Sequence, residues 1–249
     1  MDNNKLKDID ENLTKIKDKL KKKKEKEIEK KKYIEEQTYP YRAMAKLSPF
    51  FGLVIGKIRS GKSRFVGGFV SYAQQNKTYE RIMVVSPTIH TGFWSKLGIK
   101  KNNQIEDISE DKLLELQEYR KNQKNRKEWL MIFDDILAGN NARSKGLVKL
   151  VSVLRHFNIS CLIICQNCKK IDPVFRTNAD FVATYRIIGD ENLKILFRET
   201  SMGENMNEWI DKYLESTTDN HCLFINNNEN DLQKRCVKYK TDLKYWKVP

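Results

Sequence analysis

The sequence has no long apolar run and few of the residues that build disulfide frameworks or metal sites. Its 249 residues include five cysteines, three histidines and five prolines. The longest apolar stretches, such as residues 51–55 and 161–165, fall far short of the roughly 18 residues that a membrane helix needs. The N-terminus is rich in Lys and Asp and has no apolar signal region. We therefore expect a soluble, intracellular protein with no membrane span.

The cysteines are predicted to be buried free thiols. Their odd number argues against a disulfide framework. Cys165 and Cys168 have the spacing of a zinc-binding pair, but no second pair at ligand spacing exists and the histidines are scattered. A zinc site is therefore the weaker interpretation.

Positive charge is in excess along the whole chain. The formal net charge is +14, of which residues 1–39 contribute +3 and residues 40–249 contribute +11. A basic folded region favours an anionic partner, with nucleic acid as the first candidate. Solubility alone is the alternative explanation.

Residues 1–39 differ from the rest and are predicted to form a charged helical extension. Leucine and isoleucine recur at positions 6, 9, 13, 16 and 20, which is the spacing of a coiled-coil seam. The seam covers little more than two heptads and breaks at Lys21–Lys24, and Pro40 is expected to end the segment. A single solvated helix or a disordered segment is an equal alternative.

Residues 40–249 alternate between short apolar segments and helix-like segments. The predicted strands are residues 51–55, 81–86, 129–133, 159–165 and 181–187, and the predicted helices are residues 64–75, 109–127, 144–157 and a region reaching about 214. A C-terminal hairpin is predicted from residues 221–225 and 232–239. This order predicts an α/β fold with three αβα layers and a mostly parallel central sheet. Ligands bind such sheets at the carboxyl ends of the strands.

The segment after the first predicted strand, GKIRSGKS, matches the phosphate-loop pattern G-x-x-x-x-G-K-[ST]. Gly56 and Gly61 let the backbone curve around a phosphate, Lys62 would reach the β- and γ-phosphates, and the Ser63 hydroxyl would bind Mg²⁺. We predict ATP and Mg²⁺ as the ligands. The predicted nucleotide contacts are Gly56, Lys57, Ile58, Arg59, Ser60, Gly61, Lys62, Ser63 and Arg64.

Two acids and an amide follow later strands. Asp134 is predicted to hold Mg²⁺, and Asp135 to act as the general base toward the attacking water. Glu is the commoner residue at the second position, so the shorter Asp135 is a departure. Gln166 ends the next strand and is predicted to contact the γ-phosphate or the water; a buried amide that satisfies the backbone is the alternative.

The order of the motifs favours a RecA-like (ASCE) ATPase over kinases and GTPases. One strand, residues 81–86, separates the loop from the two acids in the sequence. The guanine motif Asn-Lys-x-Asp is missing, because residues 76–79 read Asn-Lys-Thr-Tyr.

Three segments together resemble the genome-packaging ATPases of the FtsK–HerA superfamily: GKIRSGKS, WLMIFDD and LRHFNISCLIICQ. The most similar type is that of poxviruses, other large DNA viruses, virophages and polinton-like elements. The resemblance covers roughly residues 48–200. It implies a homo-oligomeric ring, pentameric or hexameric, that drives double-stranded DNA into a capsid without reading its sequence. It also implies a capsid or portal protein as partner. The implied localisation is the viral factory in the host cytoplasm, and transiently the virion.

Ring motors of this type complete each ATP site with an arginine from the neighbouring subunit. Arg155 is the first candidate for this catalytic finger, and Arg176 and Arg143 follow. Each of them could equally be an ordinary surface or ion-paired arginine. Residues 139–145 are a candidate pore loop that would grip DNA phosphates, with a solvated loop as the alternative.

Two other functions fit the same motifs. A nucleotide kinase would phosphorylate a small acceptor as a monomer and would not respond to DNA. A DNA-binding assembly factor would bind ATP as a switch and hydrolyse it negligibly.

Overall fold

The computed structural model describes residues 19–26, 39–124, 127–135, 145–200, 205–231 and 235–240. The chain divides into two compact units, Met1–Tyr39 and Pro40–Pro249. In the first unit, residues 19–26 form an exposed helix in which the Leu20 side chain is 55% exposed. The other positions of the predicted heptad seam lie outside the described residues.

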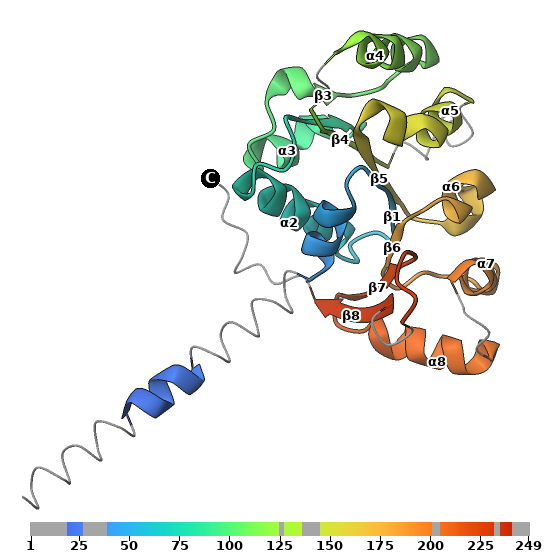
Figure 1. Ribbon diagram of the computed structural model, residues 1–249. Coiled ribbons are helices and arrows are strands. Elements are labelled where there is room, and N and C mark those ends of the chain that lie inside the picture. Colours follow the sequence, from blue (N-terminus) through green and yellow to red (C-terminus); the bar gives the residue numbers. More distant parts are fainter. Residues whose placement is uncertain are drawn as a thin grey trace, which may run out of the picture. The chain divides into compact units, whose positions relative to one another are not determined.

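Eight strands of the described chain form one sheet in the order β3-β2-β4-β5-β1-β6-β7-β8 (Figure 1). Strands β1 to β6 run parallel, whereas β7 is antiparallel to β6 and β8 is antiparallel to β7. The strands are β1 (Phe51–Ile55), β2 (Arg81–Val85), β3 (Gln104–Ile105), β4 (Trp129–Asp134), β5 (Ile159–Cys165), β6 (Phe181–Thr184), β7 (His221–Asn226) and β8 (Cys236–Lys240).

Helices cover both faces of the sheet (Figure 1). One face carries α4 (Glu110–Asn122), α5 (Lys145–Val153), α6 (Pro173–Thr177), α7 (Asp190–Thr200) and α8 (Met206–Ser216). The other face carries α2 (Lys62–Gln75), α3 (Phe93–Lys96) and helical residues 40–47. Short 3-10 helices are η1 (Ile89–Thr91), η2 (Lys101–Asn103), η5 (Leu154–Phe157) and η6 (Cys168–Lys170). The predicted three-layer α/β fold is confirmed.

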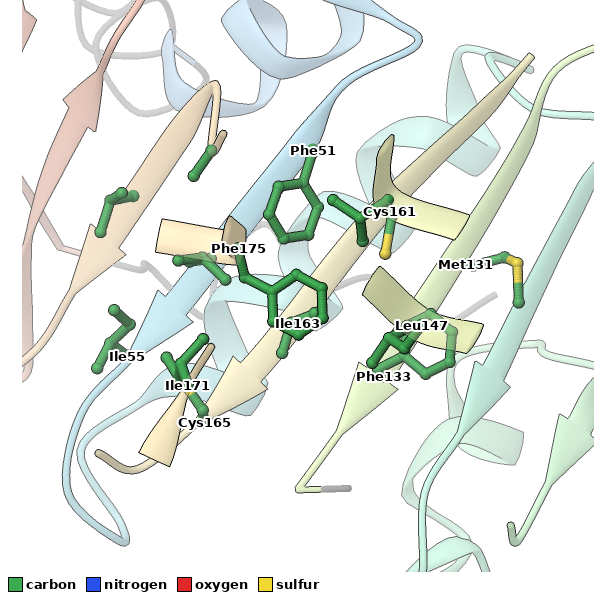
Figure 2. Packing of buried hydrophobic residues seen from close by; sticks show 14 of the residues in the cluster. Phe51, Ile55, Met131, Phe133, Leu147, Cys161, Ile163, Cys165, Ile171 and Phe175 are labelled. Atoms are coloured by element: carbon green, nitrogen blue, oxygen red, sulfur yellow. The ribbon is translucent and has the colours of Figure 1, made fainter. Parts of the chain in front are cut away.

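The central strands are buried along their whole length. Every residue of β1, β4 and β5 is buried, which explains why these strands read as continuous apolar runs rather than as alternating patterns. Figure 2 shows Phe175 of α6 and Leu147 of α5 packed on the strand residues Phe51 and Phe133. The Phe51 and Phe175 rings are 6.0 Å apart between centroids.

Four of the cysteines belong to this interior. Cys161, Cys165, Cys168 and Cys222 are buried free thiols, and Cys236 is an exposed one. Burial in apolar surroundings raises the pKa of the Cys168 and Cys222 thiols to about 12. The buried thiols therefore stay protonated and pack as small apolar side chains.

The structure differs from the sequence predictions at several element ends. Residues 39–47 form a helix that was not predicted, and the segment expected to end at Pro40 lies mostly outside the described residues. Strand β6 ends at Thr184, before the predicted end at residue 187, and Ile187 N donates its hydrogen bond to the Tyr213 hydroxyl. The predicted helix 144–157 tightens into η5 after Val153 and ends at Asn158, which has a φ of 51°. The two-residue strand β3 was not predicted, because so short a segment carries no periodicity.

Candidate nucleotide-binding site

The predicted site residues of three strands meet at the carboxyl edge of the sheet. Strand β5 lies between β1, which leads into the phosphate loop, and β4, which leads into the two acids. Ile55 pairs with Cys165, and Asp134 pairs with Ile164. Gln166 therefore follows directly after the strand that separates the loop from Asp135.

The phosphate loop has the close contacts and the backbone angles that require glycine. A Cβ atom at Gly56 would lie 2.5 Å from Tyr185 Cβ and 2.7 Å from Ser60 Oγ, so no larger residue fits. Gly61 has a φ of 113°, which is accessible to glycine and strained for other residues. Arg59 adopts the left-handed region as well, with a φ of 62°. The loop is thus tightly curved.

Helix α2 begins at the loop and leaves its first turn open to an anion. Its N-cap residue, Gly61, has no side chain to accept hydrogen bonds from the first-turn N–H groups, and the first turn of α2 contains no acid. These N–H groups carry the positive end of the helix dipole. Ser63, the second residue of α2, is half-buried, and Arg64 is exposed. The arrangement is that of a phosphate-binding helix terminus.

Lys62 is held against the loop by its own backbone. Its side chain is 7% exposed, and Nζ donates to the carbonyl oxygens of Gly56 at 2.7 Å and Lys57 at 2.9 Å. Burial lowers the pKa of Lys62, whereas the nearby groups Asp135, Cys165 and Asp134 act to raise it. A phosphate beside the ammonium group would offset this cost of burial.

Asp134 is a buried acid at the end of β4, with 7% of its surface exposed. Burial raises its pKa to about 6, and the charge of Asp135 adds to the shift, whereas hydrogen bonds from Ser86 and Trp94 and the charge of Lys62 oppose it. Ser86 Oγ donates to Asp134 Oδ2 at 3.3 Å.

The groups beside this acid are hard oxygen donors of the kind that Mg²⁺ prefers, namely the Asp134 carboxylate and the Ser86 hydroxyl. Ser63, at the start of α2, is the second predicted ligand. Ser86 was missed by the sequence analysis; its only signal was a polar residue directly after an apolar strand. A bound cation would stabilise the ionised form of Asp134, which burial disfavours.

Asp135 and Gln166 form a pair beside the loop. Gln166 Nε2 donates to Asp135 Oδ1 at 3.3 Å. Asp135 has a φ of 53°, and its own N–H donates to Ile164 O at 3.2 Å, so its unusual backbone is fixed by the sheet. Gln166 is exposed, so the alternative interpretation as a buried amide does not fit the structure. The pair has the composition needed to position and deprotonate a water molecule.

The remaining loop residues have mainly backbone roles. Lys57 N donates to Arg186 O at 3.0 Å, and this bond fixes the loop to the segment that follows β6. The side chains of Lys57, Ile58 and Arg59 are exposed, whereas the Ser60 side chain is buried. The basic side chains of Lys57 and Arg59 therefore face solvent and not the loop interior.

Arg155 lies at the opposite, amino edge of the sheet. It belongs to η5, which precedes β5, and its Nη2 is 2.6 Å from Oδ1 of the buried Asp180. Its side chain is 67% exposed. Arg155 is therefore remote from the phosphate loop of its own chain, and it could serve an ATP site only in a neighbouring subunit.

The turn that carries Arg155 is held from beneath by a buried arginine. Arg120 donates to Phe157 O at 2.8 and 3.1 Å and to Asn158 O at 3.3 Å, and its guanidinium lies 4.4 Å from the centre of the Trp129 ring. The buried Arg120 thus fixes the path of the chain just after Arg155. No sequence pattern pointed to this contact, because the partners come from three separate elements.

The other finger candidates are less suitable or lie outside the described residues. Arg176 forms an ion pair with Glu199 at 2.7 Å and also donates to Cys168 O at 3.1 Å. Its side chain is only 12% exposed, and its bonds connect α6 to α7 and η6 in the interior of the protein. Arg143 and residues 139–144 of the predicted pore loop lie outside the described residues.

The sequence profile of the family described as Poxvirus A32 protein matches residues 36–242. The chain belongs to this family. The match includes the phosphate loop, both acids, Gln166 and Arg155, whereas residues 1–35 lie outside it. The resemblance to the poxvirus type that the motifs predicted is therefore confirmed.

Solved structures with this fold include viral packaging proteins. The genome packaging NTPase B204 from Sulfolobus turreted icosahedral virus 2, in complex with AMP, aligns with a TM-score of 0.59 and 16% identity, covering 78% of this chain and 98% of B204. Its complex with AMPPCP aligns with a TM-score of 0.56 and 15% identity, covering 72% and 93%. B204 from Sulfolobus turreted icosahedral virus, described as a DNA-packaging ATPase, aligns with 0.55 and 15%, covering 73% and 94%.

At these identities the structural matches establish the fold of this member of the Poxvirus A32 protein family. A comparison with curated proteins gave no match. Among the described helices, none has the length and apolar character to cross a membrane.

Proposed function

We propose that the protein is an ATP-hydrolysing, double-stranded DNA translocase that packages a viral genome into a capsid. The observation that carries the proposal is the Gln166–Asp135 hydrogen bond, which sets a base and an orienting amide beside a phosphate loop. Membership in the Poxvirus A32 protein family and the fold shared with viral genome packaging NTPases support the viral role.

Different residues of the chain have separate roles in hydrolysis at the γ-phosphate. The α2 terminus and Lys62 bind the phosphates, and Asp135 accepts a proton from the attacking water as the water oxygen bonds to phosphorus. Gln166 orients that water, and the bond from the γ-phosphorus to the ADP oxygen breaks. Ser63 and Asp134 would hold Mg²⁺, which neutralises charge on the β- and γ-phosphates when bound.

The Asp135→Asn variant is expected to lower kcat about 10²-fold to 10⁴-fold, because an amide cannot accept the proton. Asn tolerates the left-handed backbone at this position, so the φ of 53° does not favour misfolding. Affinity for the non-hydrolysable analogue AMPPCP should be unchanged in calorimetric titration. A variant that turns over normally would show that Asp135 is not the base, and one that loses nucleotide affinity would reassign Asp135 to metal binding.

The proposal extends to partners that the present structure does not contain. The net charge of +11 on residues 40–249 supports binding to DNA phosphates without sequence readout. The exposed Arg155 at the amino edge supports a homo-oligomeric ring, pentameric or hexameric, in which this edge of one subunit faces the phosphate loop of the next. We place the motor at a capsid or portal vertex, in viral factories of the host cytoplasm and transiently at the virion.

Steady-state ATP turnover with and without double-stranded DNA tests the proposal. We expect stimulation by DNA of any sequence that fades between about 50 and 200 mM salt, because phosphate contacts release counterions. DNA of scrambled sequence serves as the control for sequence-independent binding. Turnover that is indifferent to DNA would favour a nucleotide kinase, and binding without turnover would favour an assembly factor.

A further inference from the structure

A buried acid at the amino edge of the sheet has no part in the mechanism above. Asp180 directly precedes β6 and is only 5% exposed. Its carboxylate accepts hydrogen bonds from Phe51 N at 2.8 Å, Arg155 Nη2 at 2.6 Å and Asn228 Nδ2 at 3.2 Å. Burying a carboxylate costs free energy, and its ion pair returns little net stability. The charge at this position therefore calls for a functional explanation.

The backbone of Asp180 is fixed by the strands on both sides of β6. Its N–H donates to Phe51 O at 2.7 Å, and its carbonyl oxygen accepts from Asn227 N at 2.8 Å. Phe51 is the first residue of β1, and Asn227 directly follows β7. Together with the bond from Phe51 N to the carboxylate, these contacts hold the Asp180 side chain in one place.

Arg155 reaches this carboxylate across the amino end of β1. It lies in η5, which precedes β5, and β1 lies between β5 and β6 in the sheet. The contact uses one nitrogen, Nη2, of a guanidinium group that carries five N–H donors. Within the described part of the chain, the guanidinium makes no other hydrogen bond, and the side chain is 67% exposed. The remaining donors are therefore available to a second anion, such as a phosphate.

Arg155 is thus restrained at both of its ends. Its main chain is followed by the carbonyl groups of Phe157 and Asn158, which accept bonds from the buried Arg120 at 2.8 and 3.3 Å. Its head group is bound by Asp180. A long, exposed side chain otherwise loses rotamer entropy when it binds a ligand, and holding it beforehand reduces this cost.

We propose that Asp180 is the positioning residue of the arginine finger. It binds one nitrogen of the Arg155 guanidinium, so that the remaining donors meet the phosphates bound by the neighbouring subunit. The inference rests on the proposed motor function, in which Arg155 acts across a subunit boundary. Asp180 touches no substrate and acts only through Arg155.

Steady-state ATP turnover of Asp180→Asn, saturated with DNA, tests the proposal. Asn keeps an oxygen that can accept from Phe51 N but loses the charge that binds Arg155. We expect kcat to fall about 10-fold to 100-fold, the usual cost of a misplaced catalytic group. The KM for ATP and the affinity for AMPPCP should not change, because a finger acts mainly in the transition state. A normal kcat would overturn the proposal, and a raised kcat would mean that Asp180 restrains the finger instead.

The double variant Arg155→Ala/Asp180→Asn separates positioning from a structural role. Since Asp180 acts through Arg155, the double variant should turn over within about 2-fold of Arg155→Ala alone. Losses that multiply would show a structural role and refute the proposal. Turnover that is lost in Arg155→Ala but kept in Asp180→Asn would count against positioning alone. Normal turnover in Arg155→Ala would reject the finger and Asp180 together, and wild-type turnover indifferent to DNA would count against the motor.

Asn228→Ala is the matched control. It removes the neutral donor to the same carboxylate oxygen, Oδ1, that binds Arg155, and it leaves the ion pair in place. Because one neutral hydrogen bond at an exposed residue contributes little, kcat should stay within about 2-fold of the wild-type value. A loss as large as that of Asp180→Asn would assign the effect to a disturbed turn after β7 and contradict the proposal.

Chemical rescue provides a test that leaves Asp180 unchanged, for the case that Asp180→Asn does not fold. In Arg155→Ala, the carboxylate is still bound by Phe51 N and Asn228 Nδ2. Added guanidinium ion should bind beside it by charge-assisted hydrogen bonds and raise turnover at least about 10-fold. Urea, which is planar and neutral, should not. Rescue by both compounds or by neither would be evidence against an anchored guanidinium site at Asp180.

Discussion

Arg155→Ala is expected to lower DNA-stimulated ATP turnover by about 10³-fold or more, the effect of losing an arginine finger. The reason is its location: Arg155 is 67% exposed and lies at the edge of the sheet opposite to its own phosphate loop. If it takes part in catalysis, it must do so across a subunit boundary. Turnover should be measured under DNA-saturated conditions, with AMPPCP affinity as a check that the nucleotide site is intact.

Mixing experiments separate a trans finger from a local role. Rings assembled from Arg155→Ala and wild-type subunits should lose more activity than the mutant fraction alone accounts for, since each mutant subunit disables its neighbour's site. Arg176→Ala is the control, because Arg176 is an internal ion-pair partner of Glu199. It should lower the melting temperature without poisoning mixed rings. Activity that falls only in proportion to the mutant fraction would contradict a trans role for Arg155.

The stability cost of Arg155→Ala itself should be small. The arginine is mostly exposed, so its ion pair with Asp180 contributes on the order of 1 kcal/mol at most. Asp180 keeps two other donors in the variant, Phe51 N at 2.8 Å and Asn228 Nδ2 at 3.2 Å. The folded subunit should therefore survive, and a loss of turnover can be read as a loss of catalysis.

Asp134→Asn is expected to abolish Mg²⁺-dependent hydrolysis and, at pH 7.5 without Mg²⁺, to raise the melting temperature. The first effect follows from the loss of the charged group that is proposed to hold Mg²⁺. The second follows from linkage, because the pKa of Asp134 rises from 3.8 in the unfolded chain to about 6 in the folded protein. The folded state thus binds this proton more tightly, and ionised Asp134 destabilises it.

The pH dependence gives the sign of this effect. The cost of the buried charge is absent below pH 3.8, grows as the pH rises toward 6 and is complete above that value, where it reaches up to about 3 kcal/mol. The gain from Asp134→Asn should therefore shrink as the pH is lowered from 7.5 to 4.5. Thermal unfolding across this range, with and without Mg²⁺, is the measurement.

A matched variant isolates the burial effect. Asp135→Asn makes the same change one residue later, at a half-buried position, and should shift the melting temperature much less. Mg²⁺ with AMPPCP should stabilise the wild-type protein more than Asp134→Asn, because the ligand binds only the folded state. A lower melting temperature for Asp134→Asn at pH 7.5 would mean that the bond from Ser86 outweighs the buried charge.

Sequence analysis could predict the parts of this site that depend on local spacing. The phosphate loop is one contiguous segment, so the positions of Gly56, Gly61 and Lys62 follow from the pattern itself. The strands β1, β4 and β5 were predicted almost to the residue, because full burial forces continuous apolar runs. Asp134 and Gln166 were then placed at strand ends, and parallel strands bring such ends to one edge.

Other parts of the site depend on contacts between distant segments, which carry no local signal. Tyr185 packs on the loop, Ser86 bonds to Asp134, and the turn at residues 217–221 lines the same pocket as loop residues 57–60. None of these residues belongs to a motif. They became neighbours only through the order of strands in the sheet, which a single sequence does not specify.

The sequence by itself determined the fold class, the phosphate-loop pattern and the strand ends that carry the proposed catalytic groups, because these follow from hydrophobic periodicity and from short, contiguous spacing. The tertiary structure decided the rest. In the folded protein, β5 lies between the loop and the acids, and Asp134 is buried enough to raise its pKa. Arg155 lies at the opposite edge of the sheet from the phosphate loop. Burial and strand order arise from packing over the whole chain, and so only the folded molecule reveals them.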